Sequence, residues 1–274
     1  MSLLSSYIKN FISRAGNYIL SATVIARILS FIASWIALQF IPNKELGVVL
    51  FAYNIIVFII PISGLGLHQS LLRYGSLLKT KEEKNSLFRF TFFKGIQITL
   101  ILIVCVFLIS LFINFQFEHT KRYLILLSFS LIPMYLFELI KIHFRLHLKN
   151  KTFALTEIIF TLILITTVFA LSYCLQAIGY VIALILTPTL SVLFFLPKFN
   201  SDLKVCSKPV IITREFWKYG IFASLSNVIT QLLFVIDILL IGFLLNSAEL
   251  VTAYKYIALI PLSFLFLPRV FINT

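Results

Sequence analysis

The sequence has few charged residues, and most of those it has carry one sign. Only 12% of its 274 residues are Asp, Glu, Lys or Arg, against about 25% in soluble domains. Hydrophobic residues make up 60% of the chain, and the mean hydropathy is +1.04. A chain so poor in charge cannot cover a water-facing surface. The composition therefore predicts an integral membrane protein.

Motifs for cofactors and metals are also lacking. The three cysteines are an odd number and form no CxxC pair, so neither a disulfide framework nor a thiolate metal site is expected. His143 and His147 have i,i+4 spacing, but Phe144 stands where the HExxH motif has Glu. No GxGxxG or GxxxxGK[ST] motif occurs. We therefore predict no metal site and no cofactor.

What the chain does have is a series of long apolar runs. A transmembrane helix needs about 20 such residues to cross the hydrocarbon core. We expect eight spans, at about residues 17–41, 46–66, 91–114, 123–142, 153–175, 178–196, 219–245 and 250–270. The predicted fold class is an all-α, polytopic transmembrane helix bundle. The segment 67–90 is predicted to be a cytoplasmic loop that carries a short surface helix.

The basic residues lie mainly on one side of these predicted spans. Counted on alternate sides, 18 Lys and Arg fall on one side and 3 on the other. Cytoplasmic loops of membrane proteins carry the excess of Lys and Arg. The bias predicts a cytoplasmic N-terminus. It also explains the net charge of +13, because most of the basic residues would lie in loops at the cytoplasmic surface of the bilayer. Nucleic acid is not an expected partner.

A weak internal repeat suggests how the spans are grouped. The turns at 42–46 (PNKEL) and 246–250 (NSAEL) each follow a span that enters from the inside, and six spans separate them. This spacing indicates a parallel repeat, whose second copy would end near residue ~400. We therefore expect the chain to be truncated. The predicted parts are an amphipathic segment 1–16, a six-helix lobe 17–197, a basic cytoplasmic loop 198–218, and an incomplete second lobe 219–274.

Arg27 is the sharpest candidate for a functional residue. It lies ten residues into the first predicted span, which places it near the midplane of the bilayer. Helical periodicity puts Thr23, Ser30 and Ser34 on the same face. A basic residue at this depth usually faces a water-filled cavity or a charged partner. A structural ion pair inside the bundle is the alternative.

Two charged residues lie within the last two predicted spans. Asp237 and Lys255 either neutralise each other across the helical hairpin, or Lys255 reaches outward to the interface. In a third interpretation, Asp237 is a titratable or cation-binding carboxylate.

A second group lies toward the inner ends of the fourth and fifth spans. Glu138 and Lys141 are i,i+3 neighbours and can pair, and Glu157 lies at a similar depth. With Arg145 and Lys149 they would line a charged inner vestibule, or else anchor the helices at the interface.

Arg73 closes the second apolar run at its inner mouth. It is a candidate for binding phosphate, either of a substrate or of a lipid headgroup.

Several short motifs resemble the polysaccharide transporter family. These are ELG at 45–47, GLG at 64–66 and RYG at 73–75 around the second span. The segment WKYG at 217–220, followed by Asp237, is similar to the opening of the family's second lobe, although Ile238 stands where many relatives have a basic residue. The family contains O-antigen flippases and belongs to the multidrug/oligosaccharidyl-lipid/polysaccharide exporter superfamily.

The resemblance implies a function. Such proteins have two lobes around a partly cationic cavity and move undecaprenyl-diphosphate-linked oligosaccharide across the bacterial inner (cytoplasmic) membrane by alternating access. They serve O-antigen, capsule or exopolysaccharide biosynthesis, are not enzymes, and have glycan polymerases and chain-length proteins as possible partners.

The resemblance also divides the candidate residues into two groups. Candidate ligands of the diphosphate or glycan are Arg27, Arg73 and Lys141. Candidates for ion coupling or intramembrane charge are Asp237, Glu138 and Lys255. Three alternatives stay open: a small-molecule exporter of the same superfamily, an inactive remnant, and a membrane glycan polymerase or acyltransferase. The last is disfavoured because the predicted outer loops are too short to build a catalytic site.

Overall fold

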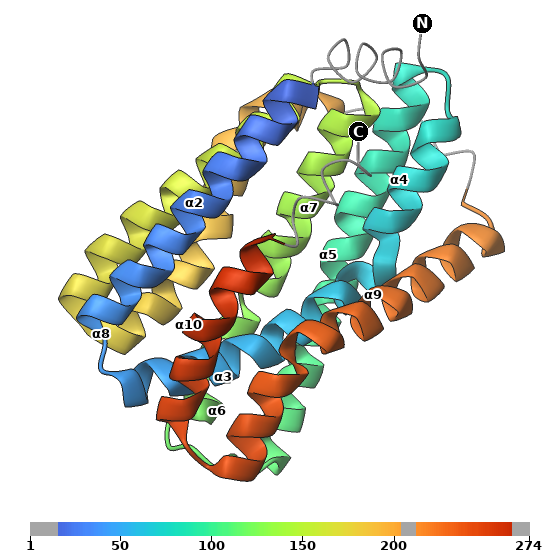
Figure 1. Cartoon of the computed structure of the whole chain (residues 1–274). Helices are drawn as coiled ribbons and strands as arrows, with labels where there is room; N and C mark the ends of the chain where they lie inside the picture. The colour runs from blue at the N-terminus through green and yellow to red at the C-terminus, as the bar shows by residue number, and fades with distance from the viewer. Residues whose placement is uncertain (1–15, 204–211, 265–274) are drawn as a thin grey trace, which may run out of the picture.

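The computed structural model describes residues 16–203 and 212–264. All regular structure in these residues is helical, which confirms the predicted polytopic helix bundle (Figure 1). The predicted amphipathic segment 1–16 lies outside the described residues except for Gly16, and so do residues 204–211 and 265–274.

The helices follow one another with short connections. In chain order they are α2 (Gly16–Phe40), α3 (Asn43–Ile59), the 3-10 helix η1 (Ile60–Gly66), α4 (Leu67–Leu77), α5 (Lys81–Phe112), α6 (Thr120–Ser128), α7 (Leu131–Leu146), α8 (Asn150–Leu203), α9 (Arg214–Leu240), the π-helix η2 (Ile241–Leu245) and α10 (Ala248–Phe264). Within the described ranges, six segments are long and apolar enough to cross a membrane: 18–40, 43–77, 81–112, 120–146, 150–200 and 214–245.

The longest of these segments, α8, is a hairpin of two antiparallel helices. Its backbone leaves the helical region at Gln176, where φ is 50° and ψ is −126°. The side-chain oxygens of Thr167 and Thr187 lie 3.0 Å apart, whereas 20 residues of straight helix would separate them by about 30 Å. The two arms match the predicted fifth and sixth spans. With this hairpin and with α10, which has 17 residues, the helices correspond to the eight predicted spans.

The prediction of a loop over residues 67–90 was wrong. Instead, α4 prolongs the second span beyond η1, and α5 already begins at Lys81. Thr80 caps α5 with a capping box, in which its Oγ1 accepts from the Glu83 N–H at 3.2 Å and its own N–H donates to Glu83 Oε2 at 3.3 Å. The many charged residues give this segment a composition typical of a loop, but Leu71 and Phe88 within it are fully buried. The predicted loop 198–218 is also shorter, because α8 and α9 extend into it.

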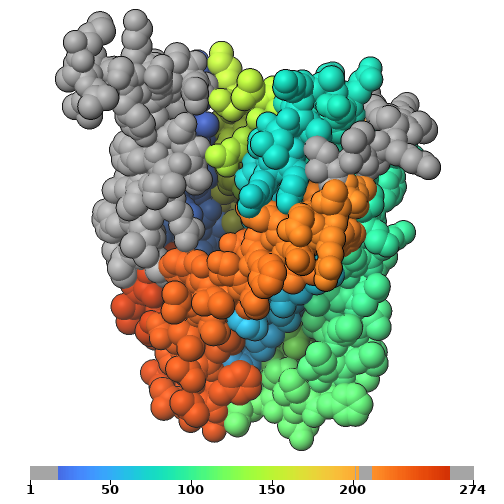
Figure 2. All heavy atoms as spheres, turned by 90° about the vertical axis from the view of Figure 1, so that its right-hand side faces the viewer, coloured from blue at the N-terminus to red at the C-terminus, as the bar shows by residue number. Residues whose placement is uncertain are grey.

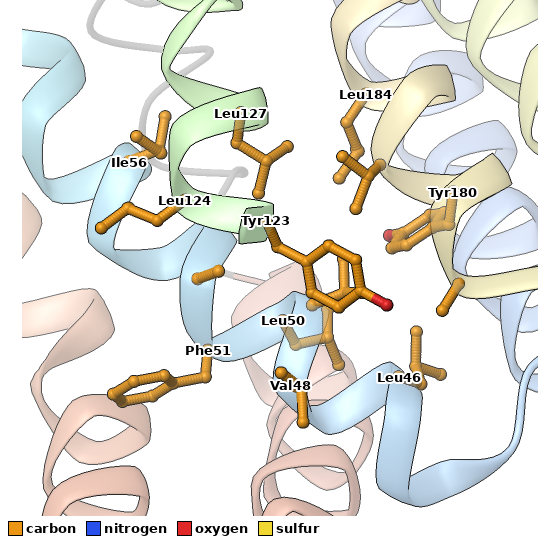
Figure 3. Close-up of a cluster of buried hydrophobic side chains, with 14 of the residues drawn as sticks. Leu46, Val48, Leu50, Phe51, Ile56, Tyr123, Leu124, Leu127, Tyr180 and Leu184 are labelled. Carbon is orange, nitrogen blue, oxygen red and sulfur yellow. The ribbon is translucent and has the colours of Figure 1, made fainter. Parts of the chain in front are cut away.

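Two apolar clusters hold the helices together. The first joins α3, α6 and the second arm of α8, where Leu46, Leu50, Tyr123, Leu127 and Tyr180 point toward one another (Figure 3). The second lies at the opposite end of α3–α4 and joins α4, α5, α7, α8 and the first turn of α9. Its largest fully buried side chains are Phe88, Phe144, Phe195, Phe199 and Phe216.

The hairpin α9–α10 packs directly on the second span. Ser70 Oγ of α4 donates to the Phe216 carbonyl of α9 at 2.7 Å. A Cβ added to Gly66 would lie 2.0 Å from the Gly220 carbonyl oxygen, so the two backbones are in close contact. Figure 2 shows α9, in orange, lying across the blue and cyan second span. The second span therefore connects the N-terminal helices with the C-terminal hairpin.

Candidate functional site

Arg27 lies about halfway along α2, on an exposed face of that helix. The opposite face is lined by small residues, with Ala22, Ala26 and Ala33 buried, and α2 packs mainly on α8 (Figure 1). Among the described residues, Arg27 has no ion-pair or hydrogen-bond partner. The ion pair that we considered as the alternative is therefore not formed within this part of the chain.

The neighbouring helix α10 comes close to α2 near Arg27. The Tyr256 hydroxyl of α10 donates to the Ser34 carbonyl at 2.7 Å, two helical turns beyond Arg27. Thr23 and Ser34, on the same face as Arg27, are half-buried, and their hydroxyls donate to carbonyls of their own helix. Among the described residues, the polar face of α2 is thus uncovered at Arg27 and contacted by α10 near Ser34.

Lys141 has very different surroundings. Its Nζ lies 3.0 Å from Glu138 Oε1 and 2.7 Å from Glu157 Oε1, and its side chain is 16% exposed. The predicted i,i+3 pair therefore forms, and a second carboxylate from α8 completes it. Two carboxylates already neutralise this ammonium group, so Lys141 is less suited than Arg27 to bind an anion.

Sequence reasoning missed His68, which belongs to the same region. His68 lies in α4, directly after the break at η1, with its ring centroid 6.2 Å from that of Tyr135. Its Nδ1 is buried and has no hydrogen-bond partner, and its charge would interact with that of Glu138. The sequence feature that could have identified His68 is its position directly after the glycine-rich break in an apolar run.

Asp237 and Lys255 do not form the pair that we expected as one alternative. Instead, the Tyr254 hydroxyl donates to Asp237 Oδ2. Consecutive helical residues point about 100° apart, so Tyr254 and Lys255 face different directions. Lys255 is half-buried and has no ion pair with any described residue.

Arg73 lies at the wall of a cavity of about 600 Å³, at the end of the bundle where α4 is followed by α5. Its guanidinium carbon is 4.4 Å from the centroid of the Tyr219 ring, which belongs to α9. The residues that line the cavity are Gln69, Leu72, Arg73, Ser76, Lys84, Arg145, Leu146, Leu148 and Tyr219. The predicted vestibule residue Arg145 is among them, whereas Glu138 and Lys141 are not.

A buried polar network ties three helices together near this end. His143 Nε2 lies 3.1 Å from Asp202 Oδ2, and Asn85 Nδ2 donates to Asp202 Oδ1 at 2.8 Å. The network joins α5, α7 and α8 and was not predicted, because Asp202 was assigned to a loop. His143 and His147 have ring centroids 4.4 Å apart, but the described residues hold no cluster of three or more His, Cys, Asp or Glu that could bind a metal.

Solved structures with the same fold include several transporters. A structure described as MATE in complex with MaL6 has a TM-score of 0.62 at 16% identity and covers 83% of this chain and 54% of its own. A second structure is a MOP superfamily transporter from Pyrococcus furiosus, described as having a binding pocket of reverse polarity. It has a TM-score of 0.62 at 16% identity, and the alignment covers 90% of this chain and 60% of the transporter. An outward-facing multidrug resistance MATE family transporter has a TM-score of 0.60 at 16% identity, and the alignment covers 81% of this chain and 52% of the transporter.

At these identities the likeness shows the fold alone. The chain spans between 52% and 60% of the length of these three structures. A comparison with curated proteins found no match. The model of the family described as polysaccharide biosynthesis protein matches residues 12–268. Because this match covers most of the sequence, the chain belongs to the polysaccharide biosynthesis protein family.

Proposed function

We propose that this protein is a flippase, which moves an undecaprenyl-diphosphate-linked oligosaccharide from the inner to the outer leaflet of the bacterial inner membrane. The product would serve O-antigen, capsule or exopolysaccharide biosynthesis. The observation that carries the proposal is Arg27, a guanidinium halfway along a membrane-length helix with no partner among the described residues.

The chemistry of the substrate explains why such a residue is needed. A glycan that crosses bare lipid would leave many hydroxyl groups without hydrogen bonds, at a cost of a few kcal/mol each. The diphosphate needs a counter-charge at the same depth, and arginine binds phosphate oxygens with two parallel N–H donors. The polyprenyl tail stays in the lipid. The polar face of α2 supports this path, because Thr23, Ser30 and Ser34 share it with Arg27.

Transport in one direction requires a change of access and a source of energy. We propose that the helices on either side of the path rock against each other, and that an ion gradient resets them. Asp237 and Glu138 are the proposed coupling carboxylates, and Lys255 contributes charge nearby. Because Lys141 is held by two carboxylates, we place it in this coupling group rather than on the diphosphate. Glycan polymerase and chain-length proteins are the proposed partners.

The test is a flipping assay in proteoliposomes with a fluorescent polyprenyl-diphosphate oligosaccharide. We expect Arg27→Gln to reduce the initial rate by about tenfold or more, because a charge-assisted hydrogen bond contributes about 1.5–3 kcal/mol. Arg27→Lys keeps the charge but loses the two-donor geometry, so an intermediate rate is expected. Arg122→Gln is the matched control, because Arg122 is exposed in the first turn of α6, near a helix end. Equal rates for Arg27→Gln and Arg122→Gln would contradict the proposal.

Export of small molecules is the second candidate. It is favoured by the shared fold with a multidrug resistance MATE family transporter. Arg27 disfavours cationic compounds as substrates, because like charges repel in a site of low dielectric constant.

A further inference from the structure

We propose that the cavity around Arg73 is a separate binding site for a phosphorylated lipid headgroup, that is, a phosphate or diphosphate ester carried on an apolar chain. The proposal deepens the proposed function and rests on it in one respect: the cavity would receive the substrate diphosphate before it reaches Arg27. The two sites are distinct, because Arg27 is not among the residues that line the cavity.

Three basic side chains from separate elements converge on the cavity. Arg73 comes from α4, Lys84 from the first turn of α5, and Arg145 from the end of α7. No Asp or Glu is among its lining residues within the described part of the chain. Three positive charges around one space repel one another, and a bound anion relieves this repulsion. The charge pattern therefore selects an anionic ligand.

The basic groups are held in place by the protein. Lys84 Nζ donates to the Leu146 carbonyl at 3.1 Å, which fixes the ammonium at the cavity wall and leaves two of its three N–H groups for a ligand. The Arg73 guanidinium lies 4.4 Å from the Tyr219 ring centroid, and its N–H groups donate to no described acceptor. A guanidinium stacked on an aromatic ring keeps its edge free for phosphate oxygens.

The rest of the lining indicates that the anion carries an apolar chain. Leu72, Leu146 and Leu148 line the same cavity, and Leu148 is 83% exposed. The cavity also lies at the helix ends that carry most of the Lys and Arg, which places it at the level of the inner headgroups. A volume of about 600 Å³ falls within the range of small-molecule sites. An inorganic anion would leave the exposed Leu148 side chain without an apolar contact, whereas the apolar chain of a lipid would cover it.

The cavity lies across the boundary between the N-terminal helices and α9. Among the described residues, Tyr219 lines the cavity from α9, whereas the other lining residues belong to α4, α5, the end of α7 and the turn that follows it. Nearby, Ser70 and Phe216 join α4 to α9 through the hydrogen bond described above. A movement of α9 away from α4 would remove the Tyr219 wall. Binding in this cavity is therefore coupled to the arrangement of the two helices.

The experiment measures the binding of farnesyl diphosphate to the full chain in uncharged detergent by calorimetry. The Arg27→Gln variant serves as the background, so that the midplane site does not contribute. We expect Arg73→Gln and Lys84→Gln each to weaken binding about ten- to a hundredfold. The matched control is Lys79→Gln, because Lys79 is exposed in the turn between α4 and α5 and does not line the cavity.

Farnesol and inorganic pyrophosphate should both bind at least about tenfold more weakly than farnesyl diphosphate. A loss with Lys79→Gln as large as with Arg73→Gln would overturn the proposal, because it would indicate general surface charge. Equal binding of pyrophosphate alone would also overturn it.

Competition in nanodiscs separates the two sources of the headgroup. If phosphatidylglycerol at 30 mol% displaces farnesyl diphosphate, the cavity binds the headgroups of bulk anionic lipid. That result would support a site for phosphorylated headgroups but would overturn its role in receiving the substrate before Arg27. If it does not, the site selects the prenyl diphosphate. Because binding is measured without transport, failure of the flipping assay leaves this result intact, and failure here leaves the Arg27 proposal intact.

Discussion

At the scale of single residues, Arg27 and Lys141 show how surroundings decide the role of a basic side chain. Both lie within helices of membrane length, but Lys141 is paired with Glu138 and Glu157 while Arg27 has no partner among the described residues. A paired charge is already stabilised and gains little from a ligand. An unpaired guanidinium within such a helix gains a counter-charge when an anion binds. This difference is why the proposed function relies on Arg27.

Asp202 allows a prediction at the same scale. Its carboxylate accepts from Asn85 and pairs with His143, and its side chain is 9% exposed. Asp202→Ala leaves these two buried groups without a partner, so the free energy of unfolding should fall by about 1–3 kcal/mol. Thermal unfolding in detergent measures the loss, with Glu82→Ala at an exposed position as the control. Equal melting temperatures for the two variants would contradict the predicted role of the network.

At the scale of helical elements, the break at η1 divides the second span into α3 and α4. Ser63, Gly64 and Leu65 depart from helical dihedral angles, and the Gly64 N–H donates to Thr99 Oγ1 of α5 at 3.0 Å. The bond satisfies a backbone donor that the broken helix leaves free. The bend directs α4 toward the N-terminal part of α9, where Gly66 and Gly220 are in contact. The break therefore positions the cavity that Arg73 lines.

Gly66→Ala tests the importance of this close contact. The residue has φ of +68°, and an added Cβ would meet the Gly220 carbonyl oxygen at 2.0 Å. The strain of the left-handed conformation costs about 1–3 kcal/mol, and the contact adds to it. We expect a lower melting temperature and weaker binding of farnesyl diphosphate, because α4 and α9 must separate. Ser226→Ala, a change of one atom at an exposed position of α9, should alter neither.

At the scale of the whole molecule, the orientation in the membrane follows from the distribution of charge. The excess of 18 basic residues over 3 predicts that the loop at 78–80 faces the cytoplasm and the loop at 113–119 faces outward. The chain should have one orientation.

A pair of matched substitutions checks this prediction. With the three native cysteines replaced, Glu82→Cys places one exposed thiol in the first turn of α5, and Glu118→Cys places one in the loop after its other end. A membrane-impermeant maleimide added to intact spheroplasts should label Glu118→Cys and leave Glu82→Cys unlabelled until the cells are lysed. The reverse pattern would contradict the assigned orientation.

Much of the fold could be predicted from the sequence, because apolar runs of membrane length need no knowledge of tertiary contacts. The prediction was wrong where a helical segment contains many charged residues. Thr80 is an example, because its capping box begins a helix in a segment whose composition is typical of a loop. The contacts of the candidate sites are mostly long-range. His143 meets Asp202 across 59 residues, and Arg73 meets Tyr219 only because η1 bends the second span. Such contacts depend on how the helices pack, which periodicity does not specify.

We propose that the substrate is an anionic, lipid-linked glycan. The most direct measurement compares two substrates in the same proteoliposomes under an imposed ion gradient: a fluorescent polyprenyl-diphosphate oligosaccharide and the cationic dye ethidium. We expect gradient-dependent movement of the glycolipid to the opposite leaflet, whereas ethidium should cross at the same rate as in liposomes without protein. Gradient-dependent transport of ethidium without movement of the glycolipid would contradict it and would support small-molecule export.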